Sequence, residues 1–137
     1  MGKKEFVEKL RDFGGLEIVK QYKSSSPTDY TFEIYVDMEK KLRTQLLRVV
    51  LPEDKKIVMA LSVIGKYSND TEMLINLLKE NVDGNYSRIC IYEDELFQIY
   101  KYPIDELDYL EMAKAFSECA RYADIYEKKY FGGVDKA

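Results

Sequence analysis

Two cysteines and two groups of carboxylates are the residues of this chain whose types could support chemistry, and the chain contains no histidine. Histidine is the commonest general base and the commonest metal ligand, so its absence removes the usual route to acid–base catalysis and zinc binding. Cys90 and Cys119 form no CxxC motif, and the chain has neither a P-loop nor a GxGxxG run. We predict that both cysteines are small apolar residues and that the protein is not an enzyme.

The two carboxylate groups invite interpretation as cation sites. One lies at the tip of a predicted hairpin, at 93–95, and its spacing is not that of an EF-hand loop. The other lies where a helix is predicted to begin, so its carboxylates can cap backbone amides and meet the positive end of the helix dipole. Its members are Asp105, Glu106, Asp108 and Glu111. We predict that neither group binds a metal and that no cofactor is used.

Tyrosine is the most informative residue type, because the chain has 12 tyrosines and no tryptophan. Strands are predicted at 86–92 and 96–102, where most aliphatic residues are odd-numbered and the tyrosines even-numbered, on opposite faces. A loop with an odd number of residues, most simply 93–95, would direct the odd-numbered aliphatic residues of both strands to one core. The other face would carry a predicted partner-binding strip: Tyr86, Tyr92, Leu96, Tyr100 and Tyr102. The alternative is that these tyrosines are simply half-buried strand residues.

A second apolar surface is predicted on a helix at 71–80. Its apolar stripe is wider than a helix resting on one surface needs, and the strand at 57–64 is apolar on both faces. We therefore expect a homodimer whose interface contains Met73, Leu74, Ile75, Leu77 and Leu78. The alternative is that the long last helix of the same chain covers these residues.

The elements that must position these residues follow from periodicity. Helices are predicted at 3–13, at 71–80 and from 105 or 108 to about 130, and strands at 31–37, 43–51, 57–64, 86–92 and 96–102. Residues 16–23 are ambiguous. The expected fold class is α+β, a single domain over 1–137 with the order α-β-β-β-α-β-β-α. Its antiparallel sheet of about five strands would carry the helices, the middle one crossing between the third and fourth strands.

Composition narrows the classes of partner. The net charge is −4 and the pI is near 5.0, so phosphate backbones and anionic membrane surfaces are repelled. No apolar run reaches the length of a membrane helix, and the first residues lack the apolar region of a signal peptide. We expect a cytoplasmic protein that binds neither nucleic acid nor membrane.

The predicted order, together with the run Ala120-Arg121-Tyr122-Ala123-Asp124-Ile125-Tyr126-Glu127-Lys128-Lys129-Tyr130-Phe131-Gly132-Gly133, resembles the type III secretion chaperone-like superfamily. That superfamily includes the CesT/Tir-type chaperones and the YbjN-type proteins. The resemblance implies a dimeric, non-enzymatic, cytoplasmic bacterial protein that binds other proteins. It implies no catalytic residues.

The sequence leaves several functions open. The first is a non-enzymatic module that binds a partner protein or peptide segment, as a secretion chaperone or a YbjN-type regulator would. The alternatives are a small-molecule-binding regulator, an enzyme that uses carboxylates and tyrosines in a cleft, and an inhibitor or immunity-type protein with one specific partner. A screen for ligand-induced thermal shifts would separate the small-molecule alternative from the first function.

Overall fold

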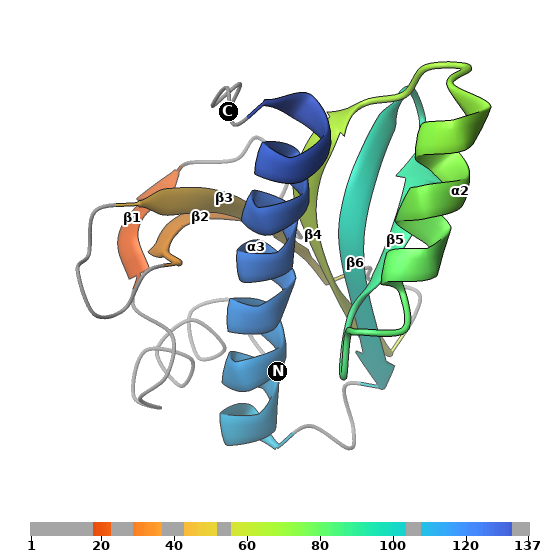
Figure 1. Ribbon diagram of the computed structural model, residues 1–137. Helices are drawn as coiled ribbons and strands as arrows, with labels where there is room; N and C mark the ends of the chain where they lie inside the picture. Colours follow the sequence, from red (N-terminus) through yellow and green to blue (C-terminus); the bar gives the residue numbers. More distant parts are fainter. Residues whose placement is uncertain (1–17, 23–28, 37–42, 52–55, 104–107, 133–137) are drawn as a thin grey trace.

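The computed structural model describes residues 18–22, 29–36, 43–51, 56–103 and 108–132. These residues form six strands in one antiparallel sheet and two helices. The strands are β1 (Ile18–Tyr22), β2 (Asp29–Tyr35), β3 (Thr44–Val50), β4 (Ile57–Lys66), β5 (Arg88–Tyr92) and β6 (Glu95–Pro103), and the helices are α2 (Thr71–Glu80) and α3 (Tyr109–Phe131). Figure 1 shows α3 lying across the sheet, with α2 beside β5.

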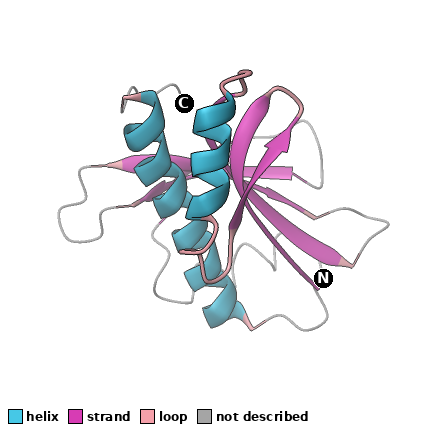
Figure 2. Ribbon diagram, turned by 45° about the vertical axis from the view of Figure 1, so that its right-hand side comes forward, coloured by secondary structure: helices cyan, strands magenta, loops and turns pink. Residues whose placement is uncertain are grey.

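The sheet order is β1-β2-β3-β4-β6-β5, so α2 connects two strands that are not neighbours. β6 returns between β4 and β5 and pairs with both of them in antiparallel fashion. Strand β5 is therefore left at one edge of the sheet. Both helices lie on the same side of the sheet, next to each other (Figure 2).

The predicted fold, with its order α-β-β-β-α-β-β-α and about five strands, is wrong. The described order is four strands, a helix, two strands and a helix, because the ambiguous segment at 16–23 contains β1. β1 pairs with β2, and its register shifts between Ile18 and Lys20. That irregularity breaks the period-two pattern on which recognition of a strand depends. The helix predicted at 3–13 lies outside the described residues.

The core consists of two clusters that α3 joins. The first packs the helix-facing side of β2, β3, β4 and β6 against the N-terminal half of α3. It includes Phe32, Leu47, Val58 and Phe116. The second packs Leu77 of α2 and strands β4, β5 and β6 against the C-terminal half of α3. One apolar face of α3 enters both clusters, through Met112, Ala113, Phe116, Ala120, Ala123 and Tyr126.

The hairpin of β5 and β6 has a different register from the one predicted. Tyr92 pairs with Glu95, so the loop has two residues, Glu93 and Asp94, instead of three. Two-residue loops are the commonest hairpin connections because their twist matches that of the strands. The pairing of Ile89 with Gln98 places the odd residues of β5 and the even residues of β6 together on the helix side of the sheet.

Candidate protein-binding surface

Among the described residues, both edge strands of the sheet carry exposed apolar or aromatic side chains: β1 has Val19 and Tyr22, and β5 has the more exposed Ile91 and Tyr92. Ile91 is 53% exposed on the helix side, and Tyr92 is 48% exposed on the opposite side. Tyr86, just before the strand, is 36% exposed and packs edge-on against Tyr100, with ring centroids 6.5 Å apart. Tyr92 makes a similar contact with Phe97 at 6.2 Å. These contacts orient both tyrosines while leaving part of each ring at the surface.

The backbone of β5 also has an outward-facing side. The Ile89 N–H donates a hydrogen bond to Oδ1 of Asn81 at 2.6 Å, so this amide is not directed at β6. Backbone groups alternate direction along an antiparallel strand, so the N–H and C=O of Ile91 face the same way as those of Ile89. Asn81 thus occupies one position of the edge, and the position at Ile91 follows it.

The residues before β5 are held by a buried carboxylate from α3. Glu118 accepts hydrogen bonds from the backbone amides of Asn85, Tyr86 and Ser87, at 2.7, 3.0 and 2.9 Å. It also accepts one from the Ser87 hydroxyl at 2.9 Å. Sequence reasoning missed Glu118, although a carboxylate on the buried face of a predicted helix was a detectable signal. Its role here is to fix where β5 begins and how Tyr86 is presented.

The predicted partner-binding strip is not one surface. Tyr86 and Tyr92 are partly exposed, whereas Leu96 and Tyr100 are buried in the core and Tyr102 is half-buried against it. Burial raises the pKa of Tyr100, whose ring packs against Phe116. The division follows from the two-residue loop, which turns the even residues of β6 toward the helices. Ile91 stays on the helix side, as the expected odd loop had placed it, but it is 53% exposed because it lies near the end of an edge strand.

The predicted dimer residues also divide into two sets. Leu77 is buried, and Met73 and Leu74 pack against the second core cluster, where the last helix also lies. Ile75 and Leu78 are 48% and 64% exposed on the outer side of α2. Three of the five side chains are therefore covered within the chain and two point outward, and the predicted homodimer stays a prediction.

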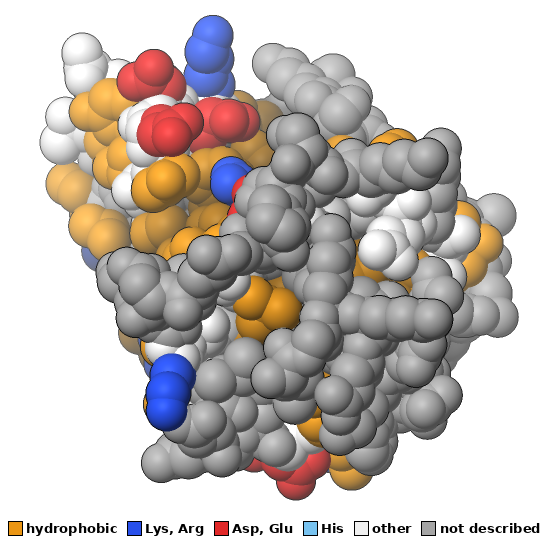
Figure 3. All heavy atoms as spheres, turned by 180° about the vertical axis from the view of Figure 1, so that it is seen from behind, with side chains coloured by type: hydrophobic (Ala, Val, Ile, Leu, Met, Phe, Trp, Pro, Cys, Tyr) orange, Lys and Arg blue, Asp and Glu red, His pale blue; other side chains and the backbone are white. Residues whose placement is uncertain are grey.

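The back of the sheet has a further apolar area. Seen from behind (Figure 3), hydrophobic side chains gather over one end of the molecule, next to several acidic groups. The register places Val63, Phe97 and Ile99 on the face opposite the helices, together with Cys90 and Tyr92. Apolar surface thus continues from the β5 edge onto this face.

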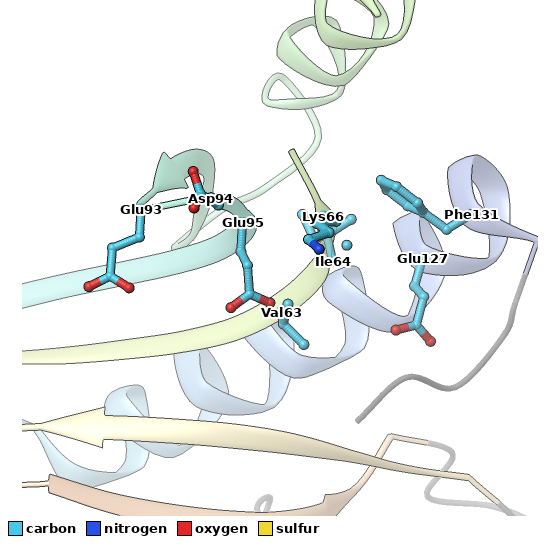
Figure 4. A pocket seen from close by; sticks show the side chains of 9 residues that line it. Val63, Ile64, Lys66, Glu93, Asp94, Glu95, Glu127 and Phe131 are labelled. Carbon is cyan, nitrogen blue, oxygen red and sulfur yellow. The ribbon is translucent and has the colours of Figure 1, made fainter. Parts of the chain in front are cut away.

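A cavity of about 350 Å³ lies near the hairpin tip, between the ends of β4 and β6 and the end of α3. Its apolar lining includes Val63 and Phe131. The ring of Phe131 lies against the backbone of Gly65, so closely that a Cβ atom at Gly65 would be 2.6 Å from the ring. Figure 4 shows the carboxylates of Glu93, Glu95 and Glu127 directed to one side and that of Asp94 to the other. Among the described residues of this lining, Glu93, Asp94, Glu95 and Glu127 outnumber the single cationic side chain, Lys66, so the cavity suits a small cation better than an anion.

The predicted metal-binding and nucleophilic candidates can be placed in part. Asp108 caps α3 by accepting from the amides of Leu110 and Glu111 at 2.9 and 3.3 Å, and Asp105 and Glu106 lie outside the described residues. Within the described ranges, no three His, Cys, Asp or Glu side chains lie close enough together to hold a metal ion. No helix in the same ranges is long and apolar enough to cross a membrane.

Neither thiol is activated as a nucleophile. Cys119 is fully buried, its Sγ lies 3.2 Å from the Gln98 carbonyl oxygen, and burial raises its pKa. Desolvation also raises the pKa of the half-buried Cys90, and this effect is larger than the lowering of the pKa by the charge of Lys101. Thiolate is the reactive form of cysteine, so both side chains are poor nucleophiles near neutral pH.

No family model matches the chain, and a comparison with curated proteins finds no significant relative.

Proposed function

We propose that this protein is a non-enzymatic protein-binding module that takes up an extended segment of a partner protein at the β5 edge. A segment in this position would extend the sheet by one strand, using backbone hydrogen bonds for affinity and side-chain contacts for selectivity. The partner is a protein, and the proposal requires no cofactor, nucleic acid or membrane.

One observation carries this proposal: the exposed side chains of Ile91 and Tyr92 lie on opposite faces of β5, a strand that no other described strand pairs with on its outer side. Natural proteins usually protect such edges with charged side chains, proline or a covering element. Here the side chain of Asn81 covers only the outward-facing amide of Ile89, which is the last outward-facing residue before Ile91. An added strand could pair with the backbone of Ile91 and pack its alternating side chains on Ile91 and on Tyr92.

The chemistry of the chain supports a binding role. Histidine is absent from the full sequence, and the pKa of each cysteine is raised. The resemblance to the type III secretion chaperone-like superfamily implies the same kind of function, but kinship with it stays a prediction. A cytoplasmic location likewise stays a prediction.

Site-specific photo-crosslinking tests the proposal. We would place a photoreactive phenylalanine analogue at position 91 and, as a control, at Lys114, which is exposed on α3. We expect position 91 to capture a protein that position 114 does not. With that protein purified, Ile91→Lys should weaken binding by about tenfold or more in calorimetry, a loss of about 1.4 kcal/mol. Equal capture at both positions, or unchanged affinity of Ile91→Lys, would contradict the proposal.

A second candidate function, small-molecule binding, is favoured by the cavity near the hairpin tip. A metabolite that occupies this cavity should raise the melting temperature in a ligand screen, and Phe131→Ala should remove that shift. Such a result, with no protein captured at position 91, would replace the first function by the second. An inhibitor of one specific protein differs from the first function only in the identity of its partner, which the crosslinking would reveal.

A further inference from the structure

The two ends of the β5 edge differ in what they offer to an added strand. At its start, Oδ1 of Asn81 already accepts from the Ile89 amide, so this outward-facing position is occupied. At its other end the edge runs from Ile91 into the hairpin tip, residues 93–95, which is exposed. A segment that pairs with the backbone of Ile91 therefore continues past the hairpin tip unless it displaces Asn81.

The hairpin tip is acidic. Glu93, Asp94 and Glu95 are exposed, and no ion pair in the described part of the chain involves any of them. Lys66 is paired with Glu95 in the register of β4 and β6, which sets one ammonium group against three carboxylates. Figure 4 shows two of these carboxylates directed to one side of the hairpin and the third, that of Asp94, to the other. A chain that passes the tip on either side therefore meets negative charge.

Glu93 is an unusual residue for its place in the turn. Its φ of +56° lies in the left-handed region, where two-residue hairpin loops favour glycine and asparagine. Glutamate at this position thus maintains a charge at the tip at a cost in turn stability. Residues that depart from the local preference are expected at functional sites, so this exception supports a recognition role for the Glu93 carboxylate.

We propose that the segment bound at the β5 edge carries a lysine or arginine two to four residues from the residue opposite Ile91, and that the carboxylates of the hairpin tip bind it. An extended chain rises about 3.3 Å per residue, so these positions lie about 7 to 13 Å beyond Ile91, beside the tip and just past it. The inference rests on the proposed function and adds a charge requirement to it. The same carboxylates repel acidic segments, so the tip selects among the extended apolar segments that could pair with this edge.

Selection from a displayed library of random dodecapeptides tests the proposal with the full chain. Peptides are selected on the wild-type protein, and those that also bind Ile91→Lys are removed. We expect the remaining peptides to be enriched in lysine and arginine at a fixed distance from an apolar residue. The matched control is the triple amide variant, Glu93→Gln with Asp94→Asn and Glu95→Gln. It keeps the size of the exposed side chains and should select edge-binding peptides without this enrichment.

Salt dependence and stability separate charge recognition from effects on the fold. Replacing the basic residue of a selected peptide by glutamine should weaken its binding about fivefold at low ionic strength, and less than about twofold at about 0.5 M NaCl. Glu93→Gly should also weaken binding, although glycine relieves the positive φ at this position and should stabilise the turn.

The possible outcomes distinguish this proposal from the proposed function. Edge-binding peptides with no excess of basic residues, or with the same excess on the triple amide variant, would overturn the charge requirement and leave the proposed function standing. A library that yields no peptide sensitive to Ile91→Lys would overturn both.

Discussion

At the scale of single residues, the tip of the β5–β6 hairpin depends on one unfavourable backbone conformation. Glu93 has a φ of +56°, in the left-handed region that side chains with a Cβ rarely adopt. The two-residue loop requires such a conformation because the primed turns that suit hairpins have positive φ at their first central residue. The register of the hairpin, and with it the burial of Leu96 and Tyr100, is therefore maintained against local strain.

Replacing Glu93 by glycine should stabilise the protein by about 1 kcal/mol, since glycine has no Cβ to penalise positive φ. The free energy of unfolding from urea titration measures this effect. Asp94→Gly is the matched control, because Asp94 does not have positive φ and glycine there adds only chain entropy to the unfolded state. Stabilisation by both substitutions, or by neither, would show that the strain at Glu93 is not what limits the turn.

At the scale of elements, tyrosines of α3 hold the end of α2. The hydroxyls of Tyr122 and Tyr126 donate to the carbonyl oxygens of Asp83 and Glu80, at 3.3 and 3.4 Å. Tyr130 donates to the Glu80 carboxylate at 2.9 Å, and Lys129 donates to the same oxygen at 2.6 Å. The last carbonyl groups of a helix lack partners within it, so these hydroxyls complete α2 while joining it to α3. Part of the tyrosine content therefore serves helix packing instead of a binding face.

Glu80 makes this junction sensitive to pH. The hydrogen bond from Lys129 lowers the pKa of Glu80 below its ordinary value, assisted by Tyr130 and opposed by partial burial. A carboxyl with a lowered pKa in the folded state stabilises folding above its unfolded pKa, and this contribution is lost as the pH falls through the folded pKa. Glu80→Gln should therefore lower the urea midpoint at pH 7 and have little effect at about pH 2, where both forms are neutral.

The control for this prediction is Lys129→Met, which removes the main cause of the lowered pKa. In that background, Glu80→Gln should change the urea midpoint by a smaller and less pH-dependent amount. An equal effect of Glu80→Gln at pH 7 and at low pH would mean that the carboxylate contributes through packing alone.

At the scale of the whole molecule, α3 joins the two halves of the sheet. Its N-terminal half belongs to the core cluster over β2 and β3, and its C-terminal half to the cluster that contains α2 and β5. Asp124 adds a polar link: the guanidinium of Arg43, which precedes β3, donates to both of its carboxylate oxygens at 2.6 and 3.2 Å. Because both clusters share one continuous helix, we expect the described parts to unfold together.

Cys119 can report that unfolding, because it lies near the middle of α3 and is fully buried. In a Cys90→Ser variant, labelling of the remaining thiol at pH 8 should be roughly 100-fold slower or more in native buffer than in concentrated urea. The urea dependence of labelling should follow the loss of helical circular dichroism. Fast labelling of the native protein would mean that α3 opens independently of the sheet.

The sequence by itself determined those elements whose patterns are local. α2 begins after Asp70, whose side chain accepts from the Met73 amide, and α3 extends from the Asp108 cap to Gly132, which has a φ of +75°. Capping and helical periodicity require only neighbouring residues, so they could be predicted. The buried set on α3 and the strong apolar character of β4 were likewise visible in the residues themselves.

Only the tertiary structure decided which strands are neighbours and which side chains are exposed. The insertion of β6 between β4 and β5 makes β5 an edge, and a loop one residue shorter than expected reversed the faces of β6 relative to β5. A shift of one residue in register exchanges every side chain of β6 between the two faces, so Leu96 and Tyr100 became core while Phe97 and Ile99 moved to the opposite face. Packing of α2 against α3 similarly separated Leu77 from Ile75 and Leu78. These outcomes depend on contacts between distant segments, which alternation within a single strand or helix does not encode.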